Sequence, residues 1–168
     1  MLENLLNLVQ QNSGESIIQN PAIPNERNDE AVALASNSIF DGIKNAVSSG
    51  NMNDVLSMFN QNNTSNENPI TQHIQGGFIQ DLVQKIGIDS SAASSIASNL
   101  IPTVLQNLVS KTNDPNDSSF DLQSIIQNVG GGNFNIKNII NSFSGNNSSN
   151  QSGGSNILDN VKGLFGNL

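Results

Sequence analysis

The chain has 168 residues, 14 of them acidic and 6 basic, with one histidine and no cysteine. Without cysteine there are no disulfides and no thiolate ligands, and one histidine cannot build a multi-histidine metal site within one chain. Six separated cations in a chain of net charge −8 argue against nucleic-acid binding, which needs clustered Lys and Arg.

The N-terminal third predicts three helices. Residues 2–18 place apolar side chains at helical spacing, with a weak point at Gly14, and the prolines within residues 20–24 end that helix. Asn25 or Asn28 is the expected N-cap of a second helix, which ends near Gly50 and carries one apolar stripe: Val32, Ala35, Ile39, Ile43 and Val47. A third, short helix follows Asn51, with Asp54 placed as in a capping box.

The middle of the chain predicts two longer helices after a polar linker over 60–68. From Pro69 to Ile86 an apolar residue recurs every four positions, with Gly87 as the C-cap and Asp89 as the next N-cap. In residues 90–109 apolar pairs also recur every four positions, so that the pair rotates by about 160° along an ideal helix. This pattern predicts a segment that is buried on most sides, or two helices that meet at Pro102, and it favours a central helix that is kinked or broken.

The C-terminal part alternates short apolar segments with Gly, Ser and Asn. We expect helices over 120–129 and 134–143, a Ser/Gly/Asn linker over 144–155 and an amphipathic helix over 156–168. The apolar residues of the last segment are the predicted interaction residues: Ile157, Leu158, Val161, Leu164 and Phe165.

Strand signals are poor, because alternating β-branched runs are missing and no Asn-Gly pair occurs. The predicted fold is therefore all-α, a multihelical orthogonal bundle of about seven or eight helices with a polar-linked C-terminal helix. No apolar run approaches the roughly 20 residues of a membrane span, and the N-terminus lacks the basic region of a secretory signal. We therefore expect no integral membrane segment and a cytoplasmic protein.

Three stretches carry a family resemblance: Met1–Val9, Asn20–Asn25 and Gly50–Asn53 with Phe59. Together they resemble the YidB-like bacterial domain of unknown function, in its Bacteroidetes-type members. The resemblance covers roughly residues 1–143, and Lys162–Gly166 also fits it. It implies a multihelical all-α fold and carries no activity or catalytic residues.

Three features could carry chemistry, and each has a simpler structural explanation. His73 lacks an evident orienting carboxylate and nucleophile, so a partly exposed helix histidine is expected. The turn over 114–121 is rich in oxygen ligands, but calcium-loop spacing from Asp114 fails, which favours a turn with a helix cap at Ser118. Gly130–Gly132 lacks the Lys-Ser/Thr and the preceding strand of a phosphate loop, which favours a helix connector.

These observations predict a non-enzymatic protein with no catalytic, metal or cofactor residues. The expected role is a protein-interaction or self-association module with apolar helix faces as contact surfaces. Two alternatives stay open: a binding domain for a small apolar or lipid-like ligand held between helices, and an enzyme of unrecognised type.

Overall fold

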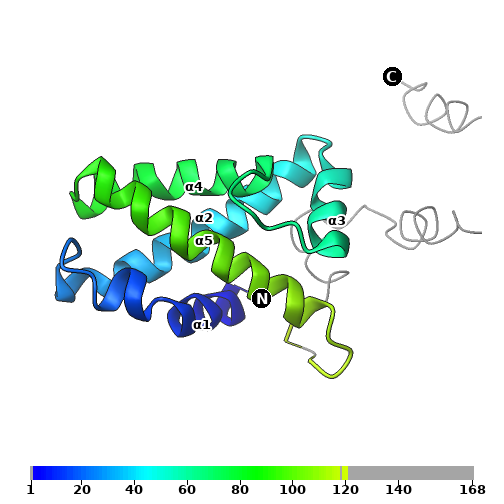
Figure 1. Ribbon diagram of the computed structural model, residues 1–168, viewed down its shortest axis with the longest axis horizontal. Coiled ribbons are helices and arrows are strands. Elements are labelled where there is room, and N and C mark those ends of the chain that lie inside the picture. The colour runs from blue at the N-terminus through cyan, green and yellow to red at the C-terminus, as the bar shows by residue number, and fades with distance from the viewer. Residues whose placement is uncertain (1, 118, 121–168) are drawn as a thin grey trace, which may run out of the picture. The chain divides into compact units, whose positions relative to one another are not determined.

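The computed structural model describes residues 2–117, 119 and 120. These residues form five α-helices and no strand, so the predicted all-α class is confirmed for this part of the chain. The helices are α1 (Leu2–Asn12), α2 (Asn28–Ser48), α3 (Met52–Gln61), α4 (Pro69–Asp81) and α5 (Ser90–Thr112), with π-helical segments η1 (Gly14–Ile18) and η3 (Leu82–Ile86) and a 3-10 turn η2 (Asn25–Arg27) (Figure 1).

Each of the five helices corresponds to one predicted from the apolar spacing. The total of seven or eight is not supported within the described ranges. The further helices predicted over 120–129, 134–143 and 156–168 lie almost wholly outside them, as does the linker over 144–155.

Among the described helices, α5 lies between α4 and α1, with α2 behind it in Figure 1. Its apolar pairs are all buried from Ile96 to Val109, as the sequence predicts for a central helix. The alternative of two helices is wrong, because α5 continues through Pro102. Pro102 lacks an N–H, yet it occurs here within one unbroken element.

α2 and α4 approach each other closely at Gly42. A Cβ atom at this position would lie 2.2 Å from Cγ1 of Ile74, whose side chain is 1 % exposed. Because Gly42 has no Cβ atom, the two helix backbones can pack together at this position. The predicted stripe of α4 and η3 is buried along its whole length, and its members are Ile70, Ile74, Phe78, Leu82 and Ile86.

The helix caps agree only in part with the sequence. Asp89 caps α5 as predicted, accepting a hydrogen bond from the Ser91 N–H, and Gly87 ends η3 with a φ of 84°. α2 and α3, by contrast, have no side-chain cap. Arg27 occupies the N-cap of α2, so the role predicted for Asn25 or Asn28 is wrong. Asn51 is the N-cap residue of α3 as predicted, but the side-chain hydrogen bonds of a capping box are not formed. Packing of the apolar faces is sufficient to define these two helices.

Hydrogen bonds and burial fix the position of the polar segment between α3 and α4. Asn68 is buried and its side chain accepts hydrogen bonds from the N–H groups of Ile70 and Thr71, which caps α4 ahead of Pro69. Thr64 is buried as well. The Gln72 side chain donates to the Asn66 carbonyl and the Gln75 side chain to the Asn66 side chain, so side chains of α4 fix the path of this segment.

The first predicted helix is divided where the sequence is weakest. α1 ends at Asn12, the buried Ser13 follows, and η1 begins at Gly14.

Among the described helices, none combines the length and the apolar character that a membrane span requires.

Candidate functional site

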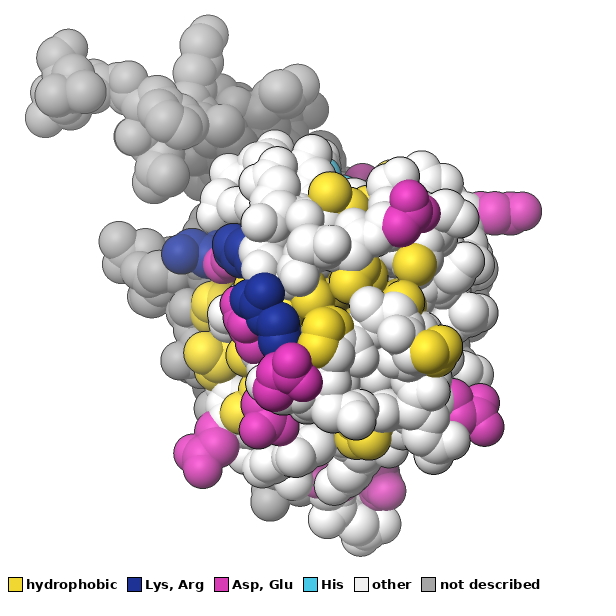
Figure 2. Space-filling model, turned by 90° about the vertical axis from the view of Figure 1, so that its left-hand side faces the viewer, with side chains coloured by type: hydrophobic (Ala, Val, Ile, Leu, Met, Phe, Trp, Pro, Cys, Tyr) yellow, Lys and Arg dark blue, Asp and Glu magenta, His cyan; other side chains and the backbone are white. Residues whose placement is uncertain are grey.

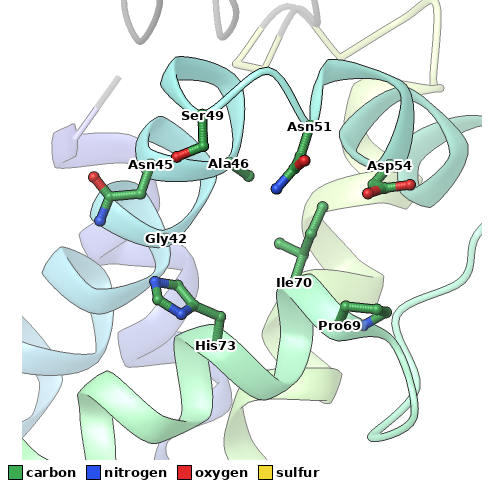
Figure 3. A pocket seen from close by; sticks show the side chains of 9 residues that line it. All are labelled: Gly42, Asn45, Ala46, Ser49, Asn51, Asp54, Pro69, Ile70 and His73. Atoms are coloured by element: carbon green, nitrogen blue, oxygen red, sulfur yellow. The ribbon is translucent and has the colours of Figure 1, made fainter.

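A cavity of about 250 Å³ opens where the end of α2 meets the beginnings of α3 and α4 (Figure 3). Asn68 and Pro69 start α4, and the burial of Ile70 and Ile74 then places His73 on the exposed side of its second turn. The close approach at Gly42 brings this side next to Asn45 of α2. The lining residues are Gly42, Asn45, Ala46, Ser49, Asn51, Asp54, Pro69, Ile70 and His73.

His73, Ser49 and Asp54 border this same cavity, a combination of the residue types that nucleophilic catalysis uses. In Figure 3 the three side chains lie apart along its edge. An activated serine needs a base within hydrogen-bond reach, and the base needs an orienting group. None of the hydrogen bonds among described residues joins any two of these three side chains, so the cavity does not contain an assembled triad.

A second cavity of about 340 Å³ continues from His73 along α2 and α4 as far as Lys85. It shares Gly42, Asn45 and His73 with the first, and polar side chains such as Asn37, Ser38 and Gln80 form much of its wall. Together the two cavities form an open groove, whose wall is mainly apolar in the first cavity and mainly polar in the second. They differ from the closed apolar cavity that the lipid-ligand alternative would favour.

Three basic side chains of the described surface, Arg27, Lys85 and Lys111, form ion pairs with carboxylates. Arg27 contacts Glu30 at 2.6 Å, and Lys85 contacts Asp81 at 2.8 Å. Figure 2 shows one face, on which basic side chains lie against acidic ones among uncharged polar and apolar groups. No three His, Asp or Glu side chains gather as a possible metal site in the part of the chain that the structure describes.

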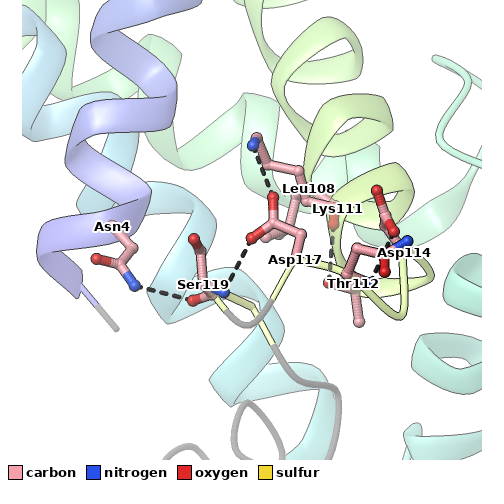
Figure 4. A network of polar contacts seen from close by, with 8 residues as sticks. Asn4, Leu108, Lys111, Thr112, Asp114, Asp117 and Ser119 are labelled. Atoms are coloured by element: carbon pink, nitrogen blue, oxygen red, sulfur yellow. Dashed lines mark hydrogen bonds and ion pairs between the residues drawn. The ribbon is translucent and has the colours of Figure 1, made fainter.

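The turn after α5 is a hydrogen-bonded connector (Figure 4). Asp114 accepts from the Asn116 N–H, and Asp117 accepts from the Ser119 N–H, both at 2.9 Å. Lys111 Nζ donates to the other oxygen of Asp117 at 2.9 Å. The hydrogen bonds from Lys111 and Ser119 lower the pKa of Asp117 from 3.8 to about 2.

The predicted turn is therefore present, with Asp117 as one of its hydrogen-bond acceptors. The Asp117 carboxylate accepts from the N–H of the residue two positions later, as the Asp89 carboxylate does at the start of α5. Ser118 and Asp121 lie outside the described residues. So do Gly130–Gly132 and all five predicted interaction residues, Ile157, Leu158, Val161, Leu164 and Phe165.

The groove at His73 could not be predicted from apolar spacing. Its walls come from α2, α3 and α4, which contact each other only after folding. One usable signal was Gly42, a glycine inside an otherwise apolar helix pattern, which often marks a close approach of two backbones.

Comparison with known proteins assigns the chain to a family. Residues 68–167 match the family model described as "Bacterial protein of unknown function (DUF937)". No curated protein and no solved structure matches the chain. The match begins at the N-cap of α4 and includes Lys162–Gly166, whereas the N-terminal motifs that suggested a resemblance precede it. Since the match covers more than half of the sequence, this chain belongs to the DUF937 family of bacterial proteins of unknown function.

Proposed function

We propose that this chain is a non-enzymatic helical module that associates with another protein chain, in the first place a second copy of itself. The contact residues are those of the C-terminal apolar segment: Ile157, Leu158, Val161, Leu164 and Phe165. Their spacing puts all five on one side of a helix, behind the polar linker over 144–155.

The extent of the family match carries this proposal. It runs from α4 through the linker to residue 167, so the apolar segment belongs to the family pattern. A short amphipathic helix cannot bury its apolar side by itself and is stabilised by binding a surface. Attachment through twelve polar residues leaves that segment free to reach a partner.

The site geometry supports a non-enzymatic role. His73 borders an open cavity with Ser49 and Asp54, but without the hydrogen bonds that would activate a nucleophile. Both cavities beside His73 are open, which favours protein association over an enclosed apolar ligand.

We also propose a closer family relationship and a domain organisation for this chain. The chain is a YidB-like member of Bacteroidetes type, with its helices in an orthogonal bundle. Residues 1–143 form the helical domain, 144–155 the linker and 156–168 the docking helix. It acts in the cytoplasm, without nucleic acid or a cofactor.

Light scattering of the full chain tests self-association over about 1 µM to 1 mM. We expect the mass to rise with concentration, and Leu164→Ser with Phe165→Ser to move the midpoint at least tenfold higher, because the variant removes apolar contact area. Gly163→Ser is the matched control, since residue 163 lies on the opposite side of the predicted helix. Circular dichroism checks that all three chains fold alike.

Sedimentation of the labelled full chain in a bacterial extract tests whether the chain binds a protein other than a second copy of itself. A faster-sedimenting species that the double variant fails to form would support the proposal. If the chain stays monomeric at every concentration and the variant sediments identically in the extract, the proposed function is wrong.

A further inference from the structure

A third cavity, of about 690 Å³, lies between the end of α1, the segment η1 and residues 95–103 of α5. α1 and η1 both pack against α5, and α1 lies next to α5 in Figure 1. The volume of this cavity is in the range of sites that bind small molecules. It shares no residue with the two cavities beside His73, so it is a separate feature of the fold. We call it the α5 cavity.

One wall of the α5 cavity is a line of polar side chains four residues apart: Ser95, Asn99 and Thr103. Residues four apart are neighbours on a helix, and each step advances by about 6 Å along its axis. The Asn99 side chain donates a hydrogen bond to the Ser95 carbonyl, and the Thr103 hydroxyl donates to the Asn99 carbonyl. The hydroxyl proton of Thr103 is therefore used within α5, whereas the side-chain oxygens of Asn99 and Thr103 keep lone pairs that can accept.

The opposite wall adds further acceptors and a negative charge. α1 ends at Asn12, and the backbone carbonyls of Gln11 and Asn12 accept no hydrogen bond from the described backbone. Both residues line the cavity, and their carbonyls carry the negative end of the helix dipole. Glu15 contributes a carboxylate, and none of the described residues that line the cavity is basic. The α5 cavity therefore favours a positively charged hydrogen-bond donor.

Two other features of the cavity wall suit a ligand. Gly14, Glu15 and Ser16 belong to the π-helical segment η1, and π-helical segments often occur at functional sites. Ile96, which is 2 % exposed, lines the same cavity and offers an apolar surface to a hydrocarbon chain. A ligand that complements all of these groups combines cationic N–H donors with short apolar links.

We propose that the α5 cavity binds a linear aliphatic polyamine, with its ammonium groups at the oxygen acceptors and its methylene groups against Ile96. Two nitrogens that are separated by four methylene groups lie about 6 Å apart in an extended chain of standard bond lengths. This distance matches the step from Ser95 to Asn99 and from Asn99 to Thr103 along α5. An ammonium group carries only donors, which complements a wall of carbonyl, hydroxyl and carboxylate oxygens.

The regular spacing favours a polyamine over the Lys side chain of a partner protein, which brings a single ammonium group. The site lies wholly within the described residues and does not depend on the proposed function of the C-terminal segment. Binding to the α5 cavity and self-association are therefore measured separately.

NMR titration of the nitrogen-labelled full chain with 1,4-diaminobutane tests the proposal. We expect the largest amide shifts within residues 11–20 and 95–103. MgCl₂ tests whether any divalent cation is sufficient, because a chain of net charge −8 attracts cations in general. Butylamine has the same carbon chain with one ammonium group and tests the need for two. Each should bind at least about fivefold more weakly than 1,4-diaminobutane, since each lacks contacts that the diamine makes.

Two variants test the two walls. Glu15→Gln removes the carboxylate charge with little change of shape, and Thr103→Val removes the hydroxyl acceptor. Both residues are exposed, and each change should raise the Kd for 1,4-diaminobutane about fivefold. Glu67→Gln is the matched control, because the exposed Glu67 lines none of the three cavities and its loss changes the net charge equally. This control should change the Kd less than twofold.

Four results would overturn the proposal. Equal affinity for MgCl₂, or equal weakening by Glu67→Gln and Glu15→Gln, would show non-specific attraction to an acidic chain. Equal affinity for butylamine would show a site for a single ammonium group, as in a Lys side chain. Shifts centred on other residues would place the site elsewhere. Finally, the absence of shifts up to about 10 mM 1,4-diaminobutane would show that the cavity does not bind a polyamine.

Discussion

Asp117 is the residue whose chemistry the fold changes most clearly. Its carboxylate accepts hydrogen bonds from Lys111 Nζ and from the Ser119 N–H, which lowers its pKa to about 2. A lowered pKa means that the folded chain favours the ionised form. The stabilisation is therefore present in full above pH 3.8, its ordinary pKa, and is lost as the pH falls towards 2.

Lys111→Met should raise the pKa of Asp117 back towards 3.8, because the hydrogen bond from Lys111 is the largest cause of the shift. A carbon-detected NMR titration of the Asp117 carboxyl group measures this directly. Lys85→Met is the control, since Lys85 pairs with Asp81 and should leave Asp117 unchanged. Titration of Asp117 near 3.8 in the unaltered chain would contradict the described contact.

At the scale of elements, the crossing of α2 and α4 depends on Gly42. A methyl group there would press on Cγ1 of Ile74, a β-branched side chain in a packed core that has little freedom to rotate. Gly42→Ala should therefore lower the free energy of unfolding by about 1–3 kcal/mol, although alanine favours the helix itself.

Gly77→Ala is the matched control on α4, since nothing lies within 4 Å of a Cβ atom at that position. This variant should gain up to about 1 kcal/mol from helix propensity. Urea unfolding measures both free energies. If Gly42→Ala is as stable as Gly77→Ala, the helices do not cross closely at residue 42.

The five described helices could be predicted from apolar spacing alone, because each buries one side against its neighbours. Apolar spacing did not predict the features that depend on contacts between helices. It left open whether residues 90–112 form one helix, since neighbours stabilise α5 through Pro102. It assigned caps to α2 and α3 that packing makes unnecessary. It also could not place His73, Ser49 and Asp54 around one cavity, because His73 comes from α4 whereas Ser49 and Asp54 lie on either side of the turn at Gly50.

At the scale of the whole molecule, residues 1–67 precede the family match but supply one half of the hydrophobic core that the described residues form. α1 and α2 pack on α4 and α5, and the buried residues of all four helices form one hydrophobic cluster. The Asn107 side chain also donates to the Asn12 side chain at 2.7 Å, which links α5 to α1. The matched region therefore relies on the N-terminal helices to cover its apolar side.

A protease site inserted between Asn62 and Asn63 tests this dependence. The insertion falls in an exposed turn, where added residues disturb little. After cleavage, the two halves should elute together in native buffer and separate in urea, because the apolar area between them remains buried. The same cut in the Gly42→Ala chain should weaken their association, and in the Gly77→Ala chain it should not. Release of the first half in native buffer, with the second half still helical and soluble, would show that the matched region is independent of α1 and α2.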